Sequence, residues 1–387
     1  MPDRRREAAS RVAAFAVITL FFFGLSWCMS AVWKFDFFYY KGDVYAYWNE
    51  SLAWGMPFHP HHPPGYPWLI ALLWTVSAGW LDPLTLLQAL SFLFLAGGAS
   101  LWIVLCNREG IPRHGWKAAL LFAAWPFVGS LYAVYPQMDA LVLFLLILGV
   151  MLSLDGRWIP AGAVLGVATL IHPLAWIFMP VLIPVPWIVW IWERRRRGPA
   201  AGSVSPASLW TMTALAIAPL IGFWIWEMIL TGDPLWAVAS IVDAQVVSRG
   251  SLPILDGWIG TIQSGGVSGW LKVGILSLVV LLSVYLLAAV LSRREAPADG
   301  RDRYRRIVSA VIPAAILGMA LLLNQHEIWA VVRFSKILLL PLILQRDRLF
   351  GFVPPRFRMP AWGVLIAAGF LSQVAYARYM VKVFFGM

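Results

Sequence analysis

The sequence predicts an all-α polytopic membrane protein with about 11 transmembrane helices and an extracytoplasmic first loop that carries interfacial helices. Sixty per cent of its 387 residues are hydrophobic and only 13% are charged. Apolar runs of about 20 residues recur, and this is the length that crosses the hydrocarbon core of a bilayer. Tryptophan, which is typical of membrane interfaces, occurs 23 times.

The expected transmembrane helices follow the apolar runs in chain order. They lie near 12–33, 84–106, 118–135, 138–154, 158–171, 173–192, 208–231, 270–292, 307–324, 330–345 and 361–383. The short apolar piece Tyr66–Leu81 is expected to be interfacial or re-entrant, because a crossing there would move Arg108, Arg113 and Lys117 to the outer side. The chain then forms one transmembrane domain, 1–387, with outer loops at 34–83 and 232–269.

Basic residues set the expected orientation. With Arg4, Arg5 and Arg6 inside, most of the 30 lysines and arginines fall on the inner side, including Arg194–Arg197, which follows the positive-inside bias. We therefore expect a multi-pass protein of the cytoplasmic membrane with a cytoplasmic N-terminus. The net charge of +11 follows this bias, so membrane lipids rather than nucleic acid are the expected partners.

The same orientation places five of the six histidines at or beyond the outer ends of the helices, so the chemistry is expected on the outer face. Asp43, in Gly-Asp-Val-Tyr-Ala-Tyr-Trp, is the main candidate. With Tyr45 beside it, this carboxylate suits a general base for a sugar hydroxyl, and Asp36 is a weaker candidate for the same role. The alternative is a loop aspartate that caps a short helix.

His59, His61 and His62 form His-Pro-His-His in the same loop. Closely spaced histidines suggest zinc, but no cysteine or fourth nearby ligand completes a tetrahedral set. A divalent metal stays an open alternative without support, and no other cofactor is expected. Donation from His61 and His62 to a phosphate oxygen is the preferred interpretation, with plain loop histidines as the alternative.

A basic pair is expected at the outer end of the helix near 330–345. Arg333 and Lys336 lie three residues apart and so on one helical face. Such a pair suits an anionic phosphate through charge-assisted hydrogen bonds, and the nearby His326 and Glu327 favour a site. Alternatively, both side chains are snorkelling anchors.

Three further outer segments hold candidates. Asp139 begins a helix, where a carboxylate favours the helix dipole but also marks a site near the membrane boundary. His172 precedes Pro173 at a tight turn and either belongs to the site or satisfies a backbone carbonyl. In Leu230–Arg249 we favour structure over catalysis, with Asp233 as a helix cap and Arg249 as a weaker candidate.

Several segments resemble GT-C glycosyltransferases, and in particular the GPI mannosyltransferase II-like family, in the same order along the chain. They are Gly-Asp-Val-Tyr-Ala-Tyr-Trp, His-His-Pro-Pro-Gly-Tyr-Pro-Trp-Leu, Tyr135-Pro136-Gln137-Met138-Asp139-Ala140-Leu141, Gly162–Pro180, Thr-Gly-Asp-Pro-Leu-Trp-Ala with Ala244-Gln245, and Arg333-Phe334…Leu340-Pro341-Leu342. Gln137 stands where the family usually has Glu, His172 where it usually has Arg, and Val rather than Gly follows Asp43.

The resemblance implies a GT-C-type helix bundle that transfers a sugar, mannose or another hexose, from a polyprenyl-phosphate donor to a lipid or glycan acceptor on the outer face. By matching position, Asp43 is the base of an inverting reaction. Arg333 and Lys336, with His61 or His62, neutralise the leaving phosphate. The alternatives are a transporter or flippase of a lipid-linked sugar, which predicts internal repeats and broken helices, and a non-catalytic membrane subunit.

Overall fold

All regular elements that the computed structural model describes are helices. The described stretches are 63–77, 79–80, 83–108, 138–197, 204–236, 254–292, 299–322 and 335–344, with single positions besides. No strand occurs within these stretches. This confirms the all-helical part of the predicted fold class.

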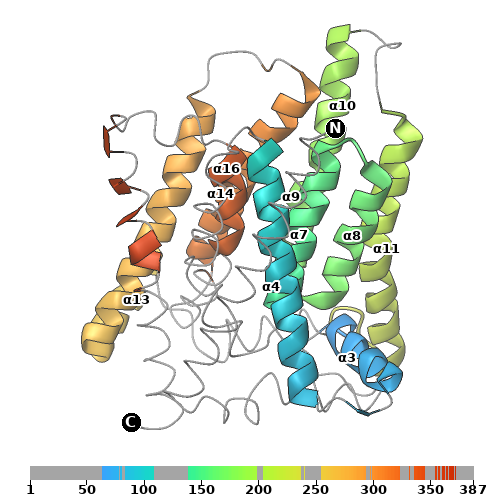
Figure 1. The fold of residues 1–387 in the computed structure, drawn as a ribbon, viewed down its shortest axis with the longest axis horizontal. Helices are drawn as coiled ribbons and strands as arrows, with labels where there is room; N and C mark the ends of the chain where they lie inside the picture. Colours follow the sequence, from blue (N-terminus) through green and yellow to red (C-terminus); the bar gives the residue numbers. More distant parts are fainter. Residues whose placement is uncertain are drawn as a thin grey trace, which may run out of the picture. The chain divides into compact units, whose positions relative to one another are not determined.

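The chain divides into two compact units. Unit 1 comprises Met1–Leu148 and Pro355–Met387, and unit 2 comprises Gly149–Pro354. Unit 1 contains α3 (Gly65–Val76), α4 (Pro83–Arg108) and the first part of α7 (Asp139–Leu154). Unit 2 contains α8 (Trp158–Ile171), α9 (Pro173–Leu182), α10 (Pro184–Arg197), α11 (Pro206–Thr231), α13 (Ile254–Leu291), α14 (Gly300–Leu322), η5 (Ser335–Leu338) and α16 (Leu339–Leu344) (Figure 1).

Four segments of unit 2 are long and apolar enough to cross a membrane. They are Pro173–Arg196, Pro206–Thr231, Val273–Leu291 and Gly300–Leu321, and they coincide with spans that the sequence predicts near 173–192, 208–231, 270–292 and 307–324. The helices at 139–154 and 158–171 also lie where predicted, but they have only 16 and 14 residues. These lengths correspond to about 21–24 Å, less than the hydrocarbon thickness of about 30 Å.

Two predicted segments differ from the structure. The predicted span near 330–345 is a four-residue 3-10 helix, η5, followed by the six-residue α16 over its described part. Pro341 is the third residue after η5, so its missing N–H interrupts regular helical hydrogen bonding there. In the predicted outer loop 232–269, helix α13 already begins at Ile254. The predicted spans near 12–33 and 118–135 lie outside the described residues, as does most of the span near 361–383.

The backbones of helices α8 and α11 approach each other closely in unit 2. A Cβ added at Gly162 would strike the backbone of Met212, and one at Gly166 would strike the backbone of Leu215. Glycines four residues apart lie on one helix face and allow two backbones to meet, which is a recurrent contact between membrane helices. Since higher-numbered residues of α8 meet higher-numbered residues of α11, the two helices run parallel.

The segment α9–α10 runs antiparallel to both. Trp176 packs on Phe223 with ring centroids 5.9 Å apart. Trp187 packs on Trp210 at 4.8 Å and donates from Nε1 to Thr213 Oγ1 at 3.0 Å. Pro184 begins α10 directly after Ile183. The proline therefore divides the segment into two consecutive helices.

The outward side of α11 is apolar and exposed. Trp210, Ile225, Met228 and Ile229 are 55–75% exposed, and the helix carries a single charged residue, Glu227. Large exposed apolar surfaces are rare on soluble proteins, whereas hydrocarbon chains solvate them readily. This face of unit 2 therefore suits contact with lipid.

Unit 2 has two chemically different ends. The His172 end holds His172 and, because α11 runs parallel to α8, also Glu227 and Asp233. The arginine end holds Asp155, Glu193–Arg196, Gly300 and Arg301. The 14 residues of α8 separate the two ends by about 20 Å.

The α8–α11 contact predicts opposite outcomes for two glycine-to-alanine changes. In Gly166→Ala the new methyl group meets backbone that cannot move aside, so the change should lower stability by about 1–3 kcal/mol. Gly222→Ala is the matched control, because nothing lies within 4 Å of its added Cβ and alanine is the better helix former. Thermal unfolding in detergent should show a lower midpoint only for Gly166→Ala. Equal midpoints would contradict the close contact.

Candidate functional site

The structure describes three of the side chains that the sequence marks as site residues: Asp139, His172 and Lys336. The other candidates lie outside the described residues: Asp36, Asp43, Tyr45, His61, His62, Gln137, Arg249, His326, Glu327 and Arg333. Their roles therefore stay predictions.

In unit 1, Asp139 begins α7, as the sequence predicts, and its side chain is completely buried. It is the only charged residue of α7, and its place in the first turn lets the helix dipole stabilise the carboxylate. Tyr66, at the start of α3, and Ser91, in the middle of α4, are also buried at 1% exposure. The three side chains form a polar group among apolar helices.

Burial and the neighbouring polar side chains both change the pKa of Tyr66. Burial of the phenol raises its pKa well above the usual value, the neighbouring Ser91 hydroxyl lowers it, and the negative charge of Asp139 raises it. Tyr66 therefore stays a neutral hydroxyl at physiological pH. A neutral phenol close to a carboxylate can donate a hydrogen bond to it or to a bound ligand. Tyr66 and Ser91 were not among the predicted site residues, although Tyr66 lies in the Pro-Gly-Tyr-Pro stretch that carries part of the family resemblance.

In unit 2, His172 forms the N-terminal cap of α9. Its Nδ1 accepts a hydrogen bond from the backbone N–H of Leu174 at 2.8 Å, and the side chain is 5% exposed. The predicted alternative was that His172 donates to a backbone carbonyl. In this contact its ring nitrogen instead accepts from a backbone N–H. Because Nδ1 accepts, the ring proton of the neutral form lies on Nε2. His172 thus combines a structural contact with a second nitrogen that can donate.

Glu227 is a buried ionisable residue that was not among the predicted site residues. It lies on α11 at the His172 end and is 4% exposed. Thr231 Oγ1 donates to its backbone carbonyl at 2.9 Å. The signal in the sequence is a lone carboxylate within a 26-residue apolar helix, which is by default a functional candidate in a membrane protein.

Lys336 lies on η5 and is completely buried. Ser335, Ile337 and Leu338 on the same helix are also buried. This placement argues against the alternative of a snorkelling anchor, which would hold its ammonium group in water. A lysine in an apolar interior keeps its charge only when an anion or several acceptors compensate it, and Lys336 does interact within the protein.

The helix that Asp233 was predicted to cap lies largely outside the described residues. Asp233 Oδ1 accepts from the backbone N–H of Leu235 at 2.8 Å in the exposed turn after α11. Gly232, at the C-terminal cap of α11, has a φ of 78°, a left-handed conformation that glycine adopts without strain. Nothing in this turn points to catalysis.

The described residues contain no group of three His, Cys, Asp or Glu side chains placed to hold a metal ion; His61 and His62 are not among them. No protein-family model, curated protein or solved structure matches the chain. Among the described residues, unit 1 offers a buried carboxylate close to a neutral phenol, and unit 2 offers a capping histidine, a buried glutamate and a buried lysine.

Two substitutions of His172 test whether the residue stabilises the protein by capping α9. His172→Ala should destabilise the protein by about 1 kcal/mol, because the α9 N–H loses its acceptor. His172→Asn should recover most of this stability, since the amide oxygen caps equally well. Thermal unfolding of both variants checks this expectation. Equal loss in both variants would show that the cap is not what His172 contributes.

Proposed function

We propose that the protein is an integral-membrane glycosyltransferase of the GT-C type, similar to the GPI mannosyltransferase II-like family. It moves a sugar, mannose or another hexose, from a polyprenyl-phosphate donor to a lipid or glycan acceptor. The reaction takes place on the outer face of the cytoplasmic membrane, and the N-terminus is cytoplasmic. Ordered motifs along the chain and helices suited to a membrane support the proposal.

The burial of Lys336 is the structural observation that carries it. This lysine falls within the stretch Arg333-Phe334…Leu340-Pro341-Leu342, which resembles the late Arg-Tyr…Phe-Pro element of the family. A cation away from water attracts a phosphate far more strongly than an exposed one does. Since Lys336 already interacts within the protein, the donor phosphate joins or replaces an existing contact.

The chemistry follows from these roles. The carboxylate of Asp43 takes the proton of the acceptor hydroxyl while its oxygen attacks the anomeric carbon of the sugar. The bond from that carbon to the phosphate oxygen breaks, the configuration inverts, and polyprenyl phosphate leaves with the electron pair. Arg333, Lys336 and His61 or His62 stabilise the negative charge that develops on the phosphate. Apolar helices hold the polyprenyl chain.

A flippase for a lipid-linked sugar is the second candidate. The observation that favours it is the change from η5 to α16 beside a buried lysine, because discontinuous helices with buried charges are typical of transporter sites. A flippase moves the donor across the membrane without consuming it. The two candidates are therefore separated by whether the sugar–phosphate bond is broken.

A transfer assay with purified protein in detergent tests the proposal. The donors are polyprenyl-phosphate mannose, glucose and arabinose with labelled sugars, and release of polyprenyl phosphate is measured. Asp43→Asn should reduce turnover about 10²–10⁴-fold, because the general base is lost. Lys336→Met, of similar length but uncharged, should reduce it about 10²–10³-fold, because one group that stabilises the leaving phosphate is lost.

Asp233→Asn is the control for both variants, because it removes one carboxylate charge at an exposed cap and should keep wild-type turnover. Full activity of Asp43→Asn would contradict the role of Asp43 as the general base. Full activity of Lys336→Met would contradict the role of Lys336 in binding the donor phosphate. If folded wild-type protein consumes none of the donors, the enzyme proposal fails. Donor movement across proteoliposomes without cleavage then favours the flippase.

A further inference from the structure

Three arginines at the arginine end of unit 2 lie over tryptophan rings. The Arg194 guanidinium carbon lies 5.2 Å from the ring centre of Trp190. The guanidinium carbons of Arg196 and Arg303 lie 5.2 and 4.6 Å from the ring centre of Trp192. Within about 6 Å, a guanidinium group is attracted to the face of an aromatic ring. Two helices, α10 and α14, therefore bring positive charge to one tryptophan.

Arg196 and Arg303 are close to each other because they share this ring. Since both guanidinium carbons lie within about 5 Å of one ring centre, they are at most about 10 Å apart. The start of α14 is packed against α10, because a Cβ added at Gly300 would strike the carboxylate of Glu193. Two positive charges that are held this close repel each other. A bound anion that contacts both of them is therefore favoured.

Among the described residues, no carboxylate pairs with any of these three arginines. Asp302 pairs with Arg306 at 2.6 Å. Asp299 caps α14, because its Oδ1 accepts from the backbone N–H of Asp302 at 2.7 Å. Arg196 donates to the Pro297 carbonyl at 2.9 Å, which uses one of the five N–H groups of a guanidinium. Most of the donors of this side chain are therefore left for a ligand.

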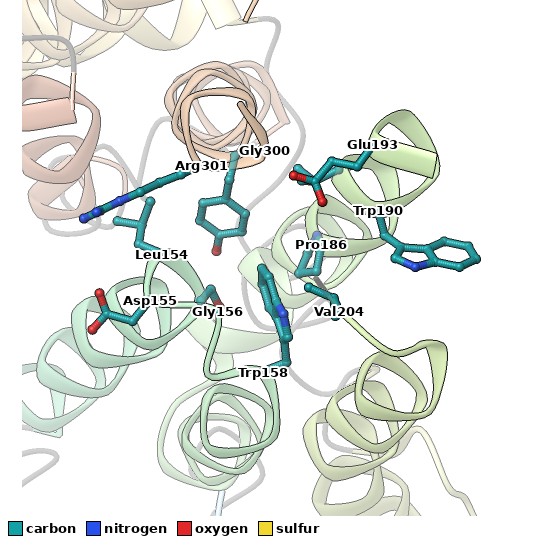
Figure 2. Close-up of a pocket in the computed structure, with 13 residues that line it drawn as sticks. Leu154, Asp155, Gly156, Trp158, Pro186, Trp190, Glu193, Val204, Gly300 and Arg301 are labelled. Atoms are coloured by element: carbon teal, nitrogen blue, oxygen red, sulfur yellow. The ribbon is translucent and has the colours of Figure 1, made fainter. Parts of the chain in front are cut away.

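Glu193, the only carboxylate of α10, is directed to another place. It projects toward the start of α14 and lines a cavity of about 220 Å³ together with Trp158 and Tyr304, whereas Trp190 extends from α10 in a different direction (Figure 2). The Glu193 carboxylate lies against Gly300. In the part of the chain that the structure describes, it makes no ion pair with an arginine. The positive charges over the tryptophan rings are therefore open to an external anion.

The stacked arginines lie at the ends of membrane-length helices. Arg196 ends the apolar segment Pro173–Arg196, and Arg303 lies in the first turn of the segment Gly300–Leu321. On α10 each tryptophan precedes its arginine by four residues, so stacking turns the guanidinium group back toward the apolar part of the helix. Tryptophan marks the level of the lipid headgroups, whereas an unstacked arginine extends into water. Stacking therefore holds these charges at the height of the lipid phosphates.

We propose that Arg196 and Arg303 bind the phosphate of an anionic phospholipid headgroup, with Arg194 as a flanking charge. Phosphate oxygens accept strong charge-assisted hydrogen bonds from guanidinium groups. Basic clusters between transmembrane helices are suited to anionic headgroups. Arg194 and Arg196 are exposed and so accessible to a lipid. The proposed sugar transfer uses none of these residues.

The surface beside the arginines favours a lipid over a free phosphate ion. Ile188, Trp192 and Arg196 follow one another at intervals of four residues and so lie along one face of α10. Ile188 is 42% exposed, and an acyl chain can cover it while the phosphate contacts the arginine. A free phosphate ion gains nothing from this apolar surface. A zwitterionic headgroup brings a positive group that the arginines repel, so an anionic phospholipid is preferred.

Binding to the purified full-length protein in a neutral detergent, measured by isothermal titration calorimetry at fixed ionic strength, tests the proposal. The probes are a short-chain phosphatidylglycerol, the phosphatidylcholine with the same acyl chains, and inorganic phosphate. Phosphatidylglycerol should bind about tenfold more tightly than phosphatidylcholine. Inorganic phosphate at the same concentration should neither bind measurably nor compete with phosphatidylglycerol.

Three variants probe the site, and a fourth is the matched control. Arg196→Gln and Arg303→Gln each remove one charge and should weaken phosphatidylglycerol binding about fivefold. Trp192→Leu keeps every charge but removes the ring that holds two guanidinium groups, and should weaken binding about threefold. Arg157→Gln removes an exposed arginine from the same end of unit 2, where no ring contact is described for it. This control should bind as the wild type does.

Each variant is compared only after its thermal midpoint is shown to match the wild type. Equal weakening in Arg157→Gln and Arg303→Gln would indicate general attraction to a basic surface and would overturn the site. Equal affinity of folded wild-type protein for the two phospholipids also overturns it, as does competition by inorganic phosphate. If Trp192→Leu does not fold, wild-type affinity in the two arginine variants overturns the proposal in the same way.

Discussion

The scarcity of polar partners inside an apolar helix bundle governs the described structure. Helices that are apolar on most sides cannot offer hydrogen bonds to an ionisable side chain, so such side chains lie near helix ends or are compensated by contacts inside the protein. Asp139 begins α7, His172 caps α9, and Glu227 lies in the last turns of α11. Gly162 and Gly166 let the backbone of α8 meet that of α11. This contact determines how the ends of α8 and α11 align.

This alignment gives unit 2 two ends with different chemistry. The His172 end carries a histidine and a buried carboxylate, whereas the arginine end carries arginines stacked on tryptophans and a cavity lined by Glu193. In the proposed glycosyltransferase the first end belongs to the catalytic side and the second to the cytoplasmic side.

Apolar periodicity and length are strong signals, so the sequence predicted the helical class and the places of α8, α9–α10, α11 and α14 well. It did not predict that 335–344 would break into η5 and α16, because the apolar run was given more weight than Pro341, whose missing N–H interrupts helical hydrogen bonding. His172 was recognised as a candidate, but its cap polarity follows from the turn geometry. The cavity at the arginine end was missed because Trp158, Glu193 and Tyr304 are far apart in the chain, and only the packing of α8, α10 and α14 brings them together.

We propose that the two ends of unit 2 face opposite sides of the membrane, with the His172 end outside. Single cysteines at Asp233 and at Asp299, in a chain whose Cys28 and Cys106 are replaced by serine, report on it most directly. A membrane-impermeant maleimide should label Asp233→Cys in intact cells, and should label Asp299→Cys only after the membrane is opened. Labelling of Asp299→Cys alone in intact cells, or of both sites equally, would contradict the claim.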